Sequence, residues 1–283
     1  QKELLKMKKV SALILALTMC TAMLTACGGG NSTTTSSAGS AAPAPTTSAA
    51  TSEAGADEGY KLATDGTLTM ATNAYFPPYE YYDGQDVIGI DADIAQAIAD
   101  KLGLKLKIED MEFDSIITAV STGKADLGLA GMTVTPDRQK NVDFSDTYAN
   151  GVQVIIVKED STIAKPDDLK GKKIGVQLST TGDLTATDEF GKDSVVQYNK
   201  GNDAVMALTQ GQIDAVIIDN EPAKSYVAAN KGLKILDTEF LNEDYAACIS
   251  KDNAGLTKAV NKALAELKAD GTLQKIVDKY IKA

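Results

Sequence analysis

The sequence predicts an α/β fold made of two similarly built lobes, and two observations support this prediction. Short β-rich runs alternate with helical patterns from Tyr60 to Ala283, as they do in α/β proteins. Residues 119–126 also recur, with substitutions, as residues 207–214, at an offset of 88 residues. In both copies an amphipathic helix ends at a glycine and an apolar strand follows. We therefore expect two lobes of roughly 100 residues each.

The individual elements follow from hydrophobic periodicity and from turn residues. Asp91 is placed to cap a helix that ends at Gly103. Apolar residues recur at helical spacing over 114–122 and over 256–282, where Gly271 divides the pattern into two helices. Strands are predicted at 68–72, 126–130, 153–157, 173–177, 195–198, 213–218 and 246–250.

The composition indicates a soluble globular protein and excludes several kinds of site. Of the 283 residues, 43% are hydrophobic and 24% are charged, which is ordinary for such a protein. Histidine is absent and there are three cysteines, which excludes Ser-His-Asp and Cys-His catalysis, histidine zinc sites and a disulfide framework. We therefore expect neither a metal nor a cofactor. The formal charge of −11 argues against a nucleic-acid partner, because nucleic-acid binding depends on Lys and Arg that neutralise phosphates.

The amino terminus has the pattern of a secretory signal peptide, which we expect to span residues 1–27. Met7-Lys8-Lys9 precedes an apolar run, Val10–Leu24, that is too short to span a bilayer comfortably. Leu24-Thr25-Ala26-Cys27 resembles the bacterial lipobox, in which the cysteine is lipidated. We expect a lipid on Cys27 to tether an extracytoplasmic protein to the bacterial cell membrane. A buried thiol and a plain transmembrane anchor are the alternatives at Cys27.

Residues 28–59 form a predicted disordered tether. They are almost entirely Gly, Ser, Thr, Ala and Pro with a few acids, and such a composition buries too little apolar surface to offset the entropy of ordering. A flexible coil of this length has an r.m.s. reach of roughly 30 Å. The tether could therefore hold a folded domain close to a membrane without pressing it against the surface.

Arg138 is the single arginine in a chain that otherwise uses lysine as its basic residue. Thr135 and Pro136 precede it in the pattern of a helix start, with Thr135 as the cap. Such a start would place the guanidinium and free backbone N–H groups near the strand end at Thr133, where they can bind a carboxylate. We therefore interpret Arg138 as a carboxylate clamp, and an exposed surface charge is the alternative.

Small polar and acidic residues follow the predicted strands at their carboxyl ends, where ligands of open α/β sheets bind. Under the 88-residue offset Gly131 matches Asp219, so both would face a shared cleft. Asp219 is a candidate acceptor for a ligand ammonium or, alternatively, a capping residue. Phe76 and Phe113 either close over a ligand side chain or pack in the core. The candidate ligand-binding residues are Asn73, Phe76, Phe113, Ala130, Gly131, Thr133, Arg138, Gln177, Thr180, Thr181 and Asp219.

Several segments of the chain resemble the family 3 extracellular solute-binding proteins, the amino-acid receptors of ABC importers. The resemblance covers about residues 66–282 and is most specific over 130–145. It implies a two-lobe, periplasmic-binding-protein-like fold, in which two hinge strands join the lobes around an interlobe cleft. The segments that carry it are Ala71-Thr72-Asn73, Phe76-Pro77-Pro78-Tyr79-Glu80-Tyr81, Gly89-Ile90-Asp91-Ala92-Asp93-Ile94, Ala130-Gly131-Met132-Thr133-Val134-Thr135-Pro136-Asp137-Arg138, Val142-Asp143-Phe144-Ser145 and Asp167-Asp168-Leu169-Lys170-Gly171-Lys172-Lys173.

The resemblance also implies where the lobes begin and end and what each site residue does. Lobe 1 would comprise 60–152 and 246–283, lobe 2 would comprise 153–245, and the crossings would fall near 151–154 and 245–248. The ligand carboxylate would bind Arg138, Thr133 and the Thr181 backbone. The ammonium would bind Asp219 and Gly131, with Thr133 as a further partner, and Phe76 and Phe113 would enclose the side chain.

The implied function is that of a monomeric receptor that binds a free polar or basic L-amino acid and delivers it to an ABC permease. Relatives that take basic or amide side chains often carry Asp where this chain has Asn73, which leaves Glu112 or Asp114 as possible substitutes. Two alternatives stay open. One is a dehydratase-like enzyme on the same fold, with a cleft carboxylate as general acid, and the other is a ligand-sensing domain for a signalling partner.

Overall fold

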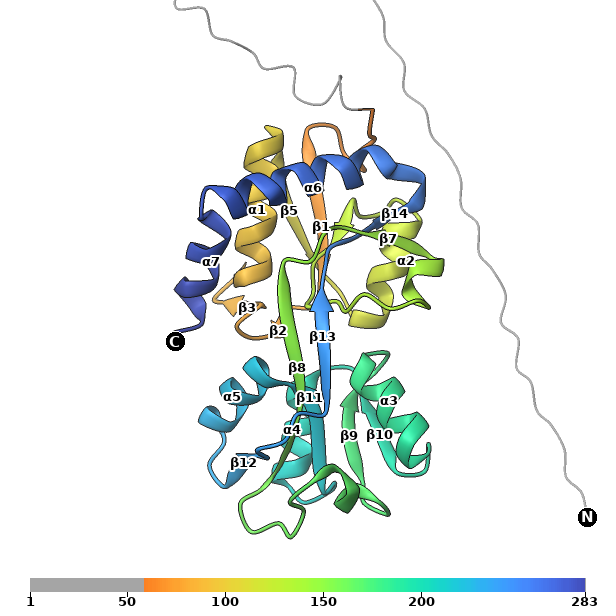
Figure 1. The fold of residues 1–283 in the computed structure, drawn as a ribbon, viewed down its shortest axis with the longest axis vertical. Helices are drawn as coiled ribbons and strands as arrows, with labels where there is room; N and C mark the ends of the chain where they lie inside the picture. The colour runs from red at the N-terminus through yellow and green to blue at the C-terminus, as the bar shows by residue number, and fades with distance from the viewer. Residues whose placement is uncertain (1–58, 283) are drawn as a thin grey trace, which may run out of the picture. The chain divides into compact units, whose positions relative to one another are not determined.

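The computed structural model describes residues 59–282, and these form two lobes, each built around one sheet (Figure 1). The predicted signal peptide, Cys27 and nearly all of the predicted tether lie outside the described residues. Within 59–282, no helix is long and apolar enough to cross a membrane. The order of strands is β5-β1-β6-β14-β7 in the first sheet and β10-β9-β11-β8-β12 in the second, where β13 also pairs with β8.

The first lobe carries its helices on a mixed sheet and has a small separate sheet at one side. Its main strands are β1 (Thr67–Thr72), β5 (Lys105–Asp110), β6 (Leu127–Gly128), β7 (Val142–Phe144) and β14 (Cys248–Ser250). The small sheet contains β2 (Tyr75–Phe76), β3 (Glu80–Asp83) and β4 (Asp86–Ile88). The helices are α1 (Ile90–Leu102), α2 (Ile116–Ser121), α6 (Ala254–Ala269) and α7 (Thr272–Tyr280), with 3₁₀ turns η1 (Phe113–Ser115), η2 (Arg138–Lys140) and η4 (Lys251–Asn253).

The second lobe is a sheet with helices packed against its strands. The strands are β8 (Ala149–Lys158), β9 (Ile174–Gln177), β10 (Val195–Tyr198), β11 (Ala215–Asp219), β12 (Leu233–Ile235) and β13 (Leu241–Tyr245). The helices are α3 (Thr181–Phe190), α4 (Gly201–Thr209) and α5 (Asn220–Ala229), and η3 (Pro166–Leu169) is a 3₁₀ turn. Apolar residues of β8, β9 and β11 fill the two cores of this lobe.

Two strands that lie side by side, β8 and β13, connect the lobes (Figure 1). They pair antiparallel from Ala149 opposite Tyr245 to Gln153 opposite Leu241. β8 then continues into the second sheet beside β11, whereas the chain after β13 enters the first sheet as β14. The lobes are therefore joined by hydrogen-bonded backbone. The residue boundaries given above for the lobes stay a prediction.

The internal repeat corresponds to the same local structure in both lobes. α2 precedes β6, α4 precedes β11, and each strand is preceded by an aspartate. The Asp126 carboxylate accepts from the Thr69 amide at 2.7 Å, and the Asp214 carboxylate accepts from the Lys173 amide at 2.8 Å. In return each aspartate amide donates to the carbonyl of the same partner. The repeated Gly-x-x-Asp segment thus fixes one strand against its neighbour in each lobe.

Asp91 does not cap the first helix, so that prediction is wrong. Helix α1 begins at Ile90, with Gly89 as its N-cap, and Asp91 lies inside the first turn with its side chain buried. Its carboxylate accepts from the Gly131 amide at 2.8 Å and from the Tyr148 hydroxyl at 2.7 Å. Glycine is required at position 89 because its φ is 131° and an added Cβ would overlap the Tyr79 carbonyl.

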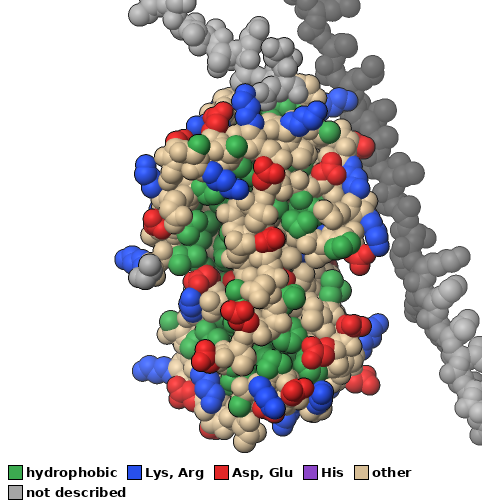
Figure 2. All heavy atoms as spheres, viewed as in Figure 1, with side chains coloured by type: hydrophobic (Ala, Val, Ile, Leu, Met, Phe, Trp, Pro, Cys, Tyr) green, Lys and Arg blue, Asp and Glu red, His purple; other side chains and the backbone are tan. Residues whose placement is uncertain are grey.

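Charged side chains of both signs are interspersed over the face of the molecule seen in Figure 2. Ion pairs such as Lys101 with Glu266 and Lys279 with Asp93 lie at the surface, where solvent screening leaves them little net contribution to stability. The stability of the described residues therefore rests mainly on the apolar cores of the two lobes.

Candidate functional site

One cavity is lined by residues of both lobes and of the strands that connect them. Ten of the eleven predicted ligand-binding residues line it, and only Asp219 is missing from the lining. Six lining residues were missed by the sequence analysis. The ten are Asn73, Phe76, Phe113, Ala130, Gly131, Thr133, Arg138, Gln177, Thr180 and Thr181, and the six are Glu80, Gln153, Ile217, Ile218, Glu243 and Tyr245.

Arg138 is fixed in the cavity wall by backbone carbonyls. One guanidinium nitrogen donates to the Thr133 carbonyl at 2.8 Å and another to the Ser179 carbonyl at 3.1 Å. The guanidinium also lies over the Phe113 ring, 5.3 Å from its centroid. Because the residue is only 8% exposed, the alternative of an exposed surface charge is wrong. A buried guanidinium held in this way is oriented to receive a carboxylate.

The segment before Arg138 is less helical than predicted. The structure has a single 3₁₀ turn, η2, where the sequence suggested a helix start. The Thr135 hydroxyl does accept from the Arg138 amide, at 3.2 Å, as a cap would. A turn this short supplies few free N–H groups, so the guanidinium carries the anion-binding capacity here.

A second group of hydrogen-bond donors lies at the start of α3, in the other lobe. Thr180 caps this helix, and its hydroxyl accepts from the Asp183 amide at 3.2 Å. Thr180 and Thr181 both line the cavity, and the first N–H groups of a helix have no partner within the helix. Ser179 precedes them with a φ of 64° and presents its carbonyl to Arg138. The guanidinium and the helix terminus therefore meet at one place in the cavity.

Further hydrogen bonds join the lobes around the cavity. The Gln177 amide nitrogen donates to the Asn73 side-chain oxygen at 2.9 Å, and the Asn73 nitrogen donates to the Met111 carbonyl at 2.8 Å. Outside the lining, the Tyr226 hydroxyl donates to the Tyr75 carbonyl. Both side-chain groups of Asn73 therefore have partners in this structure, and its bond to Gln177 joins the two lobes.

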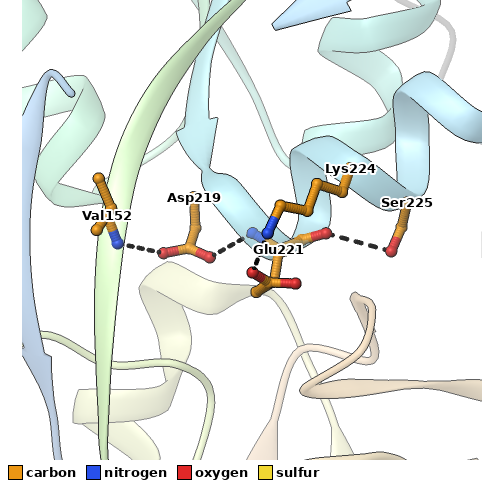
Figure 3. A network of polar contacts seen from close by, with 5 residues as sticks. All are labelled: Val152, Asp219, Glu221, Lys224 and Ser225. Carbon is orange, nitrogen blue, oxygen red and sulfur yellow. Dashed lines mark hydrogen bonds and ion pairs between the residues drawn. The ribbon is translucent and has the colours of Figure 1, made fainter. Parts of the chain in front are cut away.

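Asp219 lies next to the cavity and accepts hydrogen bonds from three donors, of which Figure 3 shows the Val152 and Glu221 amides. Its Oδ1 accepts from the Glu221 amide at 3.1 Å, and its Oδ2 accepts from the Val152 amide at 3.1 Å and the Tyr245 hydroxyl at 2.6 Å. The capping alternative is therefore observed, because Glu221 lies in the first turn of α5. Tyr245 does line the cavity. The role of Asp219 as an acceptor for a ligand ammonium stays a prediction.

Phe76 and Phe113 line the cavity and also pack against core residues. The two alternatives given for them are thus compatible. Phe76 stacks on Tyr79 with ring centroids 5.6 Å apart and lies over Gly131, where an added Cβ would come within 2.8 Å of its ring. Because residue 131 is a glycine, the Phe76 ring can lie against its backbone.

Two glutamates are the acidic side chains in the lining of the cavity. Glu243 accepts from the Gln153 side chain at 3.0 Å through Oε2, while its buried Oε1 has no hydrogen-bond partner. Glu80 is 1% exposed and comes from β3. Glu112 and Asp114, suggested above as acidic substitutes, do not line the cavity. Glu243 and Tyr245 are two residues apart, as side chains on the same face of a strand are, and this spacing is the signal in the sequence that could have indicated them.

Burial raises the pKa of Asp91 and of Asp219 from the ordinary value of 3.8 to about 6. Desolvation is the main cause for both groups. Hydrogen bonds from Gly131 and Tyr148 to Asp91, and from Tyr245 to Asp219, lower the pKa in opposition. Both groups therefore bind protons more readily in the folded chain than in the unfolded chain.

We expect the ligand-free protein to become more stable as the pH falls from 7 to 5. Between the unfolded pKa of 3.8 and the folded pKa of about 6, the folded state holds more protons. The free energy of unfolding should therefore fall as the pH rises through this window. Urea unfolding at constant ionic strength measures this, and Asp91→Asn should flatten the profile. A stability that climbs steadily from pH 4 to pH 7 would contradict the expectation.

Gly151, in the connecting strand β8, is expected not to tolerate a side chain. A Cβ added there would overlap the Tyr245 ring and lie 2.6 Å from the Asp219 carboxylate. Gly151→Ala should therefore displace Tyr245, break its hydrogen bond to Asp219 and destabilise the chain by about 1–3 kcal/mol. Thermal unfolding checks this. Asn150→Ala is the control, because it changes an exposed side chain next in sequence. Gly171→Ala is not suitable as a control, because the φ of 75° at Gly171 would itself strain an alanine.

The chain is similar to known solute-binding proteins along most of its length. The model of the bacterial extracellular solute-binding proteins, family 3, matches residues 68–283. The arginine-binding extracellular protein ArtP of Bacillus subtilis (strain 168) is 36% identical over 240 residues, which cover 81% of this chain and 90% of that protein.

Solved structures with the same fold include an ancestral arginine-binding protein in two ligand states. Bound to arginine it shares 42% identity and a TM-score of 0.72, covering 76% of this chain and 98% of that chain. Bound to glutamine the values are 41% and 0.74, with 78% and 100% covered. An ancestral amino acid-binding protein, a precursor of cyclohexadienyl dehydratase, shares 35% identity and a TM-score of 0.72, with 77% and 96% covered.

Proposed function

Because this chain belongs to the family 3 bacterial extracellular solute-binding proteins, we propose that its cavity binds a free L-amino acid with a cationic or amide side chain, arginine first among them. The chain is an amino-acid receptor of an ABC import system, as its curated relatives are. The observation that carries the choice of side chain is the pair of glutamates in the cavity wall. Glu80 and Glu243 are both buried, and each has a carboxylate oxygen without an N–H or O–H donor.

The two ends of such a ligand match the two ends of the cavity in charge. Arg138 and the start of α3 suit the ligand carboxylate, which accepts hydrogen bonds from both lobes. Asp219, reached past Tyr245, suits the ammonium once that group displaces part of its present hydrogen bonding. The aromatic rings of Phe76 and Phe113 suit the stem of the side chain.

The glutamates favour a cationic or amide side chain over an apolar one. An apolar side chain would leave the buried Glu243 Oε1 without a partner, and an unpaired buried charge costs several kcal/mol. A guanidinium or an amide supplies the missing N–H donors. The names of the relatives agree with this choice, because one ancestral relative binds arginine in one structure and glutamine in another.

A thermal-shift screen of the purified protein over the twenty amino acids tests the proposal. Arginine should give the largest rise in melting temperature, with smaller rises for lysine, histidine and glutamine and none for leucine or valine, because binding to the folded state stabilises it. A protein stabilised only by apolar amino acids would overturn the proposed side-chain class. A protein stabilised by none would overturn amino-acid binding by this cavity.

We expect ligand binding to make the protein more compact. A ligand held by Arg138 in one lobe and by Thr181 in the other favours closure about the two connecting strands. Small-angle scattering with and without arginine should show a fall in the radius of gyration. Binding without any compaction would mean that the ligand does not bridge the lobes.

An enzymatic function is the second candidate, since one neighbouring structure is a precursor of a dehydratase and the cavity contains a buried carboxyl, Glu80. The receptor proposal requires that the ligand is recovered unchanged after prolonged incubation. Mass spectrometry of the incubated sample decides between the two functions. A dehydratase would remove water from the ligand and leave a product of lower mass, whereas a receptor would leave the mass of the ligand unchanged.

We also infer that the receptor acts as a monomer and is held at the membrane by a lipid on Cys27. The support for the lipid is the lipobox-like segment in the sequence. Expression in a bacterial host followed by mass spectrometry of the amino-terminal peptide tests the lipid, and Cys27→Ala should release the protein from the membrane fraction. Light scattering of the released protein measures its mass and so tests the monomer.

A further inference from the structure

We propose that Glu80 and Asp91 form a carboxyl pair that shares one proton beside the ligand side chain, and that a cationic side chain expels this proton whereas a neutral one leaves it in place. The inference rests on the proposed function, since it assumes that amino acids bind in this cavity. It adds a property of the site, namely that the charge of the side chain sets the number of protons released on binding.

The pair is defined by contact and burial. Glu80, from β3, is 1% exposed and lines the cavity, and Asp91, from α1, is fully buried behind it. The Asp91 amide donates to the carbonyl of Tyr79, the residue before Glu80, at 2.8 Å, so the two carboxyl groups lie beside each other, and each shifts the pKa of the other. Glu80 Oε2 and Asp91 Oδ1 are both buried and have no N–H or O–H donor. Two carboxyl groups can hydrogen-bond to each other only if one of them carries a proton. A single proton shared between Glu80 and Asp91 would give both of these oxygens a hydrogen-bond partner.

The partners of Asp91 place the proton on Glu80. Asp91 Oδ2 accepts from the Gly131 amide and the Tyr148 hydroxyl, and both bonds stabilise the ionised form of Asp91. No N–H or O–H donor reaches Glu80 Oε2. Burial and the neighbouring Asp91 raise the pKa of Glu80 well above its ordinary value.

The other charged and titratable groups around Glu80 reinforce this placement. Asp110 at the end of β5 and Asp219 at the end of β11 act on it as further negative charges. The hydroxyls of Tyr148 and Tyr226 belong to the same surroundings and stay protonated, because burial raises the pKa of both. Arg138, the cation in the cavity lining, donates to the backbone carbonyls of Thr133 and Ser179 instead.

The two classes of ligand should treat this proton differently. A guanidinium placed against Glu80 pairs with the ionised carboxylate, so the proton leaves Glu80 for the solvent and the net charge of the site is preserved. A neutral amide or ureido group can donate an N–H to the Glu80 oxygen that carries no proton, so the proton shared with Asp91 stays in place. The affinity for the cation should then rise about tenfold per pH unit wherever the free protein holds the proton and the complex does not.

The test compares arginine with citrulline, its neutral ureido counterpart of the same length. Calorimetric titration of the purified full chain at pH 6 and pH 7, in two buffers of different ionisation enthalpy, gives the number of protons released. Arginine should release up to about one proton more than citrulline. Any contribution of Asp219 cancels in this difference, because both ligands carry the same α-ammonium group.

Glu80→Gln is the decisive variant. The new side chain has nearly the same shape, and its NH₂ group can donate to Asp91 as the protonated carboxyl does, so the fold should be retained. The excess proton released by arginine should disappear, and the arginine affinity should lose the part of its pH dependence that the citrulline affinity does not share. Glu243→Gln is the matched control, since it also removes a buried glutamate from the cavity wall. This control should weaken arginine binding but keep the excess proton.

The outcomes separate the two proposals. Arginine binding without excess proton release, or an excess that persists in Glu80→Gln, overturns the carboxyl pair and leaves the receptor function intact. If citrulline does not bind, the comparison of arginine binding between the unsubstituted chain and Glu80→Gln gives the same decision. A chain that binds neither arginine nor any other amino acid overturns the proposed function itself.

Discussion

Replacing Arg138 by lysine is expected to weaken amino-acid binding by about 2 kcal/mol or more, a loss of roughly thirtyfold in affinity. Lysine keeps the positive charge but loses the planar fork, so it cannot bind a carboxylate while donating to two backbone carbonyls in fixed directions. In the structure the buried Arg138 guanidinium donates to the backbone carbonyls of Thr133 and Ser179. Calorimetry with the amino acid that gives the largest thermal shift measures the loss.

Lys140→Ala is the matched control for this prediction. Lys140 belongs to the same 3₁₀ turn, but its side chain is 73% exposed and pairs with Asp137 at the surface. Its removal should leave the affinity unchanged, which would exclude a general effect of positive charge near the cavity. Unfolding of the ligand-free Arg138→Lys protein should be measured as well, because the lost carbonyl contacts are part of the structure. An unchanged affinity in Arg138→Lys would exclude the carboxylate clamp.

Replacing Asp219 by asparagine is expected to abolish detectable binding and also to destabilise the fold by about 1–3 kcal/mol. From the sequence, we would expect the fold to be spared, because a residue facing an open cleft is solvated. The structure changes this expectation, since both carboxylate oxygens accept hydrogen bonds from buried donors. The NH₂ group of asparagine would face at least one of these donors.

Tyr245→Phe distinguishes a binding role of Asp219 from a purely structural one. This change removes one donor but leaves the Asp219 charge in place. If Asp219 binds the ligand ammonium, Tyr245→Phe should retain binding and Asp219→Asn should lose it in the fraction of protein that remains folded. If Asp219 only caps α5, both variants should lose stability and bind the ligand with the same affinity once folded.

Much of the fold was predictable from the sequence, because it depends on local patterns. The runs that become β1, β9, β10 and β11 are apolar or β-branched and bounded by turn residues, and α6 and α7 show clear helical periodicity. The repeat of residues 119–126 indicated two similar lobes, which the structure contains. The strands that were missed, such as β5 and β13, carry several charged residues, and their assignment depends on the sheet that they join.

The site was predictable where its residues follow strand ends, and not where it depends on contacts between distant segments. Arg138, Thr133 and Thr181 could be placed because a strand and a turn position them locally. Glu80 and Glu243 are buried acids, which a single sequence does not distinguish from surface acids. Their burial depends on tertiary contacts, such as those with Asp91 for Glu80 and with Gln153 for Glu243.

The hydrogen bonds that join the lobes have a consequence for the rate at which cargo escapes. A ligand enclosed by both lobes leaves only after bonds such as Gln177 to Asn73 and Tyr226 to Tyr75 have broken. Dissociation therefore cannot be faster than lobe opening, and amino acids of different affinity share this upper limit. Because the Tyr226 and Tyr75 side chains lie outside the cavity lining, Tyr226→Phe should speed the escape of every ligand by the same factor. We therefore expect the time for which an amino acid stays bound to depend partly on residues outside the cavity lining.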